Sequence, residues 1–150
     1  MNAARMAMVW TGGVALIAAA SLNVLAVIGR HTGLPLKGAI ELVQVAVLVA
    51  GSLALVAATL ARNHARVHLI LDRLTGMRRV GAERLCTALS ILFYAMLLTG
   101  SLWLAMDLWG EQEVSELLDV PWRWMRAFLN AALIVVILLL ARQMVERREK

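Results

Sequence analysis

The sequence predicts an all-α membrane protein with four transmembrane helices plus an interfacial amphipathic helix between helices two and three, in a single membrane domain at residues 1–150. Three observations favour this class. Hydrophobic residues make up 61% of the chain, above the roughly 45–50% of soluble domains. Four apolar blocks approach the roughly 20 residues that a helix needs to cross a bilayer. These blocks also lack the period-two alternation of barrel strands.

Basic residues are distributed unevenly among the loops between these blocks. If the N-terminus is cytoplasmic, eleven of the 15 lysines and arginines lie on the cytoplasmic side. The other side then holds four, namely Arg30, Lys37, Arg123 and Arg126. Cytoplasmic loops carry an excess of positive charge, so this asymmetry predicts that both termini are cytoplasmic. The net charge of +5 is then explained by topology and attraction to anionic membrane lipids, and no nucleic-acid partner is expected.

The first predicted helix covers about residues 6–28. A cleaved signal peptide is the alternative, but the apolar run is longer than the roughly 7–15 residues of a signal-peptide core. Asn23 is a polar side chain that could hydrogen bond to another helix or to a ligand. We favour a bond between helices, because such contacts are common in membrane proteins. Gly33 and Pro35 interrupt the chain in the loop that follows.

The second predicted helix covers about residues 39–61 and carries Glu41 and Gln44 near one end. A carboxylate inside a membrane segment is a candidate functional group, because burying it unpaired is costly. Glu41 also lies in the first helical turn, where the helix dipole favours negative charge. Arg30 and Lys37 are available as its partners. We therefore favour an anchoring role, in which Glu41 forms a charge pair or caps backbone groups, over proton or ion carriage.

Small residues recur along the same helix. Ala50, Ala54 and Ala58 repeat every four residues, and Gly51 and Ser52 lie beside them. Patterns of this kind let the backbones of two membrane helices approach closely. The pattern predicts a helix-packing face on this segment.

The segment at about residues 64–80 has a different character. Apolar residues recur there at helical spacing among arginines, which is typical of an amphipathic helix that lies in the membrane interface. Arg66 belongs to its cationic surface, which should attract anionic lipid. His64 and His68 are four residues apart and could supply two metal ligands. Apart from Asp72 no further ligand lies at a matching spacing, so we favour solvated histidines.

The third and fourth predicted helices cover about residues 85–109 and 122–143. Tryptophans gather at one predicted depth, as in the aromatic belt of a membrane surface; they are Trp103, Trp109, Trp122 and Trp124. The loop between the helices is acidic over residues 111–119, and it is either solvated or attracts a basic partner. Arg123 and Arg126 can extend to the lipid headgroups. Substrate binding is the less favoured alternative for them, because both lie near a helix end.

Recognisable catalytic or cofactor chemistry is lacking in the sequence. No nucleophile, base and acid are placed to act together, and no glycine-rich phosphate loop is present. The histidines do not pair across the bilayer as haem ligands would. A transporter acting alone should show internal repeats or broken helices with polar groups at the midplane. We therefore expect a protein that is not an enzyme, holds no cofactor or metal, and supports a partner.

Two short stretches resemble a known family. Residues 35–43, PLKGAIELV, resemble the P-x-x-G-A-x-E-[LIV]-V start of the second helix in the DctQ-type small membrane subunit of TRAP (tripartite ATP-independent periplasmic) transporters. Residues 63–67, NHARV, are similar to the G-H-[IV]-x-V-D stretch that follows the same helix. The matched positions include Gly38, Glu41 and His64.

The resemblance implies a role as well as a fold. Such subunits associate with a large membrane subunit that holds the sodium and substrate sites, while a periplasmic binding protein delivers an organic acid or related solute. This chain would then be a non-catalytic brace in the bacterial inner membrane. The family glycine before the histidine is Asn63 here, and the acidic residue after the valine is His68. Any local pairing of that acidic group must therefore differ in this chain.

Two other functions stay open from the residues themselves. A stand-alone proton-coupled carrier is motivated by Glu41 in the second helix. An anchoring subunit of an unrelated membrane complex is compatible with the small-residue packing faces. The solute of a transporter would be recognised by other subunits, so this sequence does not name it.

Overall fold

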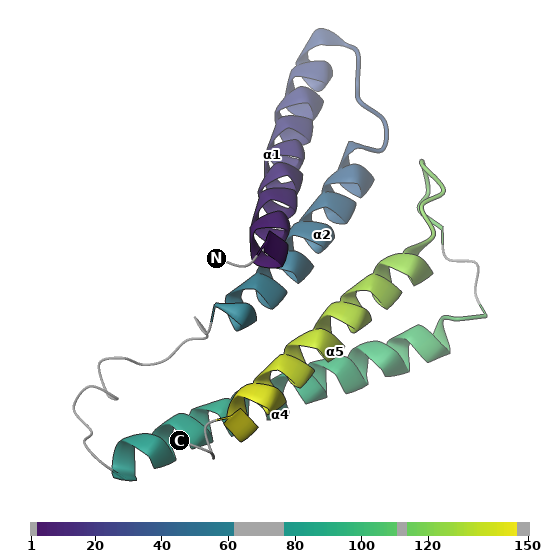
Figure 1. Cartoon of the computed structure of the whole chain (residues 1–150). Helices are drawn as coiled ribbons and strands as arrows, with labels where there is room; N and C mark the ends of the chain where they lie inside the picture. The colour runs from purple at the N-terminus through teal and green to yellow at the C-terminus, as the bar shows by residue number, and fades with distance from the viewer. Residues whose placement is uncertain (1–2, 62–76, 111–113, 147–150) are drawn as a thin grey trace.

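The computed structural model describes residues 3–61, 77–110 and 114–146, and its long elements are all helices (Figure 1). They are α1 (Ala3–Thr32), α2 (Ala39–Leu60), α4 (Met77–Asp107) and α5 (Trp122–Glu146). Each contains a segment long and apolar enough to cross a membrane; these are Arg5–Thr32, Ala39–Leu60, Val80–Asp107 and Trp122–Val145. The prediction of four membrane-length helices is therefore confirmed.

Helices α1 and α2 form a hairpin whose turn begins with a Schellman-type cap on α1. Gly33 adopts a φ of 77°, and the Leu34 amide donates to the Gly29 carbonyl at 2.9 Å. A Cβ added at Gly29 would lie 2.5 Å from the Leu34 carbonyl oxygen, so glycine lets the loop fold back onto the helix. Along the hairpin, a Cβ added at Gly12 would lie 3.7 Å from the Ala50 carbonyl oxygen. The two helices therefore approach closely there.

Helices α4 and α5 form a second hairpin, which packs on the first through α5 (Figure 1). The packing order across the molecule is α1, α2, α5, α4. Within the described part of the chain α1 and α4 do not contact each other, so the helices form an open layer and not a closed four-helix bundle. The buried apolar cluster draws on α2, α4 and α5, and it comprises Val56, Tyr94, Leu133, Val136 and Leu140.

Large apolar side chains are exposed along all four helices. Ile17 on α1, Met96 on α4 and Leu138 on α5 are 69%, 69% and 63% exposed. In water such surfaces would drive association, but lipid tails are as apolar as leucine and solvate them. The exposed surface is therefore consistent with a protein embedded in a bilayer.

A polar contact joins α2 and α5 at the end of the pair that lies opposite the two loops. Gln143 Nε2 donates to the Thr59 carbonyl at 2.8 Å. The last carbonyls of a helix have no partner within the helix, so α5 supplies one. The Thr59 hydroxyl donates to the Leu55 carbonyl at 2.7 Å, and Thr59 is fully buried. The hydroxyl and the carbonyl of this residue are thus both satisfied.

The helix limits differ from the predicted ones where helices continue beyond their apolar blocks. Helix α1 continues to Thr32 and does not end near residue 28. Helix α4 begins at Met77, not near residue 85, so it includes the last part of the segment 64–80 that was expected to form the interfacial helix. Helical hydrogen bonds remain favourable outside the hydrocarbon, so hydropathy alone places these ends too far inward. The remainder of that segment, with His64 and Arg66, lies outside the described residues.

Candidate functional site

The N-terminus of α2 is shaped by a glycine. Gly38 precedes the helix with a φ of 74°, and no side chain caps the helix end. The Leu42 amide donates to the Gly38 carbonyl at 3.1 Å, which starts the helical hydrogen-bond pattern. Only glycine adopts this left-handed conformation readily. The turn places Glu41 in the first turn of α2, beside the α4–α5 loop.

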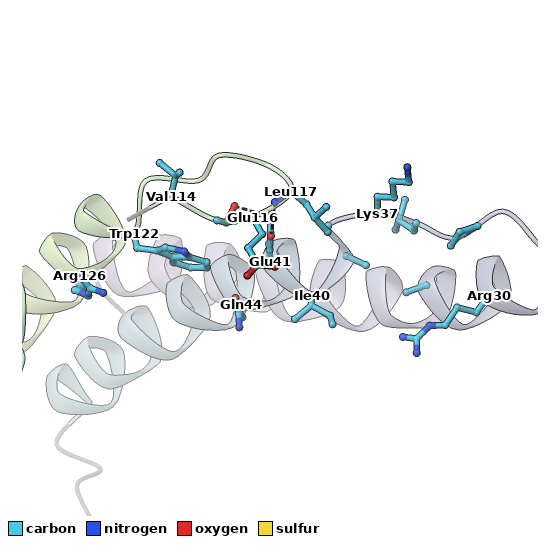
Figure 2. Close-up of a pocket in the computed structure, with 16 residues that line it drawn as sticks. Arg30, Lys37, Ile40, Glu41, Gln44, Val114, Glu116, Leu117, Trp122 and Arg126 are labelled. Atoms are coloured by element: carbon cyan, nitrogen blue, oxygen red, sulfur yellow. Dashed lines mark hydrogen bonds between the residues drawn. The ribbon is translucent and has the colours of Figure 1, made fainter. Parts of the chain in front are cut away.

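The Glu41 carboxylate binds this loop directly (Figure 2). Its Oε2 accepts hydrogen bonds from the Ser115 hydroxyl at 2.7 Å and from the Leu118 amide at 2.9 Å. Its Oε1 accepts a hydrogen bond from the Leu117 amide at 3.0 Å. Hydrogen bonds to an ionised acceptor are stronger than those between neutral groups. One side chain of the first hairpin therefore holds the loop of the second.

Residues 114–121 of the loop fold around Ser115. This residue is 4% exposed, and its amide donates to the Val120 carbonyl at 3.1 Å. Its hydroxyl donates to Glu41 and also accepts a hydrogen bond from the Val120 amide at 3.0 Å. Val114 and Pro121 form an isolated antiparallel bridge at the base of the loop. The donors that face Glu41 are thus held in place by the loop's own backbone.

An apolar contact reinforces the polar one. A Cβ added at Gly38 would lie 2.7 Å from Cγ of Leu118. The Leu118 side chain therefore occupies the space that any other residue would need before α2. Gly38 and Glu41, three residues apart, hold the same loop through packing and through hydrogen bonds.

An open cleft of about 910 Å³ surrounds the Glu41 contact. Gln44 of α2 lines it, together with the cations Arg30, Lys37 and Arg126. Figure 2 shows Arg30 and Arg126 on opposite sides of Glu41, and Lys37 pointing away from the carboxylate. The cations do not converge on one point. The geometry therefore favours a structural contact at Glu41 over a site for one small anion.

The basic residues expected to pair with Glu41 are placed elsewhere. Arg30 and Lys37 are both exposed, and within the described chain neither forms an ion pair with the carboxylate, whose partners are loop donors. Two of those donors are backbone amides, as a capping role requires. They belong to the α4–α5 loop, however, and not to α2.

The other predicted site residues lie apart from the Glu41 contact. Trp122 lines the cleft, whereas Trp109 is 62% exposed and lines a separate groove between α4 and α5. Asn23 is exposed on α1, and in the part of the chain that is described it makes no hydrogen bond to another helix. His64 and Arg66 cannot be placed, because they lie outside the described residues.

Sequence reasoning missed Ser115, Leu118 and Gln143. A usable signal for the loop was its apolar Leu117-Leu118 pair, because exposed apolar residues in an acidic loop can mark a contact surface, and Leu118 contacts Gly38. No spacing rule connects that loop to Glu41, which belongs to the other hairpin. The signal for Gln143 was weaker, because it is a single polar side chain in the last turns of a membrane helix.

Comparison with known proteins assigns the family. The family described as "Tripartite ATP-independent periplasmic transporters, DctQ component" matches residues 19–150. No curated protein and no solved structure matches the chain. The matched region starts within α1 and includes the Glu41 contact and all of α2, α4 and α5. The chain is therefore a multi-pass inner-membrane protein that belongs to the DctQ family, the small subunit of TRAP transporters.

Proposed function

We propose that the chain is a non-catalytic brace for the large membrane subunit of a sodium-coupled TRAP transporter. In this proposal a periplasmic binding protein delivers an organic acid or related solute. The sodium and substrate sites lie in the large subunit, and the brace itself holds no cofactor. Membrane lipids cover those apolar surfaces that no subunit covers.

The contact at Glu41 carries this proposal. Glu41 is the only acidic residue in α2, and a carrier would need it free to bind a proton or an ion. Its carboxylate instead accepts three hydrogen bonds from the chain's own loop. Gln143 and Thr59 join the same helix pair at its opposite end. Two hairpins tied at both ends are suited to a static support, and they are poorly suited to a moving element.

The charge distribution supports one orientation of this brace. Both loops of the hairpins, at residues 33–38 and 108–121, lie on the side that carries four of the 15 basic residues. By the positive-inside rule, both termini are then expected in the cytoplasm. In that orientation the Glu41 contact and the acidic loop face the periplasm, where the binding protein arrives.

Affinity purification tests the brace directly. The tagged full-length chain is extracted from its native membrane in mild detergent, and the proteins that accompany it are identified by mass spectrometry. We expect a large multi-helix subunit in about equal amount. Recovery of the chain alone, as a homo-oligomer, would contradict the proposal and favour a stand-alone carrier. Recovery of an unrelated membrane enzyme would favour an anchoring role.

Transport in liposomes tests the role of Glu41 within that complex. Glu41→Gln should lower the thermal stability of the complex and leave its sodium dependence intact. Glu116→Gln is the matched control, because Glu116 lies in the α4–α5 loop that Glu41 binds, lines the same cleft as Glu41 and is exposed. A changed ratio of sodium to solute in Glu41→Gln would show that the carboxylate takes part in coupling.

A further inference from the structure

A second groove, of about 810 Å³, lies along α2, and single residues of α4 and α5 complete its lining. On α2 it extends from Val43 to Ala58, and Tyr94 and Leu129 contribute from the other two helices. At 1.5 Å per residue its α2 side is about 22 Å long. That length covers most of the roughly 30 Å of bilayer hydrocarbon. The groove therefore has the dimensions to seat a membrane-spanning segment.

Small residues line the groove. Gly51 and Ala54 are exposed there and Ala58 is partly exposed, and a Cβ added at Gly51 would meet nothing within 4 Å. Ala50 is only 2% exposed and lies near Gly12 of α1. The small-residue pattern of α2 therefore has two sides. Helix α1 occupies one side, and nothing within the described chain occupies the other.

The hydroxyl of Ser52 provides an independent observation in the same groove. Ser52 lines the groove and is 2% exposed, yet its Oγ has no hydrogen-bond partner in the described chain. Other helical hydroxyls, including those of Ser21, Thr59 and Ser90, donate to the carbonyl four residues earlier. An unpartnered polar group in the hydrocarbon layer is costly. Ser52 thus contributes to the groove wall a polar group that has no partner within the described chain.

We propose that this groove seats a transmembrane helix of a partner subunit, an inference that rests on the proposed brace function. The partner helix presents a small residue to Gly51, so that the two backbones approach closely, and a hydrogen-bonding side chain to Ser52. Gln44 is exposed at one end of the groove, and Figure 2 shows it pointing away from the loop that Glu41 holds. It offers a second polar contact. A lipid acyl chain would fill the groove but would leave both polar groups unpaired.

A pair of glycine substitutions tests the groove. Gly51→Leu adds bulk where the isolated chain has open space, so the chain should insert and fold as before. The recovered partner subunit should fall roughly tenfold or more, because close backbone approach is lost. Gly100→Leu is the control, because Gly100 is an exposed helical glycine of α4 whose Cβ position is also open. It should leave recovery unchanged. Ser52→Ala should lower recovery about threefold, as for an average hydrogen bond between membrane helices.

Site-specific photocrosslinking identifies the occupant. Benzoylphenylalanine at Val47, which lines the groove and is 50% exposed, should form an adduct with the large subunit. The same probe at Ile17 on α1 should not. A Val47 adduct with a second copy of the chain or with lipid alone, or no adduct from an intact complex, would overturn the groove assignment and leave the brace standing. Absence of the large subunit from the purified wild-type sample would instead remove the brace proposal itself.

Discussion

Replacing Glu41 by glutamine should open the α4–α5 loop while the helices remain folded. Both carboxylate oxygens act as acceptors, Oε1 for one donor and Oε2 for two. Glutamine has one acceptor oxygen, so its NH₂ group must face at least one loop donor. Hydrogen bonds to charged groups contribute roughly 1.5–3 kcal/mol, and neutral ones about 1 kcal/mol. Losing one bond and weakening the others should lower the free energy of loop opening by about 2 kcal/mol.

Amide hydrogen exchange of the purified chain in nanodiscs measures this loss. A decrease of about 2 kcal/mol in opening free energy raises exchange at Leu117 and Leu118 roughly thirtyfold, since 1.4 kcal/mol corresponds to about tenfold. Glu116→Gln should leave exchange at these amides unchanged. Unchanged exchange in Glu41→Gln would refute the reasoning, because it would show that packing of Leu118 on Gly38 is sufficient to hold the loop.

Three further substitutions test neighbouring contacts. In each case the free energy of unfolding is measured by reversible unfolding of the chain in detergent, with circular dichroism as the signal. Gly38→Ala should destabilise the chain by about 1–2 kcal/mol, because φ is left-handed there and the added methyl meets Leu118. Adding Leu118→Ala should recover part of this stability, and no recovery would exclude the clash. Ser115→Ala removes one donated and one accepted hydrogen bond, so the free energy of unfolding should fall by about 1–2 kcal/mol. An unfolding midpoint equal to that of the wild type would contradict this. Gln143→Leu should cost roughly 0.6–1.7 kcal/mol; no loss would mean that the Thr59 carbonyl does not need this donor.

Hydropathy was sufficient to predict the four membrane helices, because crossing the hydrocarbon imposes both apolarity and a minimum length on each segment. It predicted the limits of α2 and the start of α5, but not the end of α1 or the start of α4. Helix α1 continues to Thr32 and α4 begins at Met77, since the hydrogen-bond pattern of a helix does not stop at the boundary that hydropathy detects. The packing order of the helices could not be predicted either, because no periodic pattern in the sequence indicates that α2 lies between α1 and α5.

The candidate site was predictable in part. The first-turn position of Glu41 and the glycine before it were visible in the sequence, and they directed attention to this end of the molecule. The nearest cations in sequence, Arg30 and Lys37, were the natural guess for its partners. The observed donors come from a loop in the other hairpin, at Ser115 and beyond. Contacts of that kind depend on tertiary packing, which one sequence does not specify.

The two polar ties between the hairpins also determine their angular stiffness. Glu41 and Thr59 lie near opposite ends of α2, and at 1.5 Å per residue they are about 27 Å apart along its axis. Thermal displacement of an ordered atom is about 0.5 Å along one axis. Over a lever arm of about 27 Å, such a displacement at one tie rotates α5 against α2 by only about one degree. Two hydrogen-bonded points therefore fix the crossing angle of α2 and α5, so a force applied at the end that carries the hairpin loops would be transmitted to the opposite end with little loss to bending.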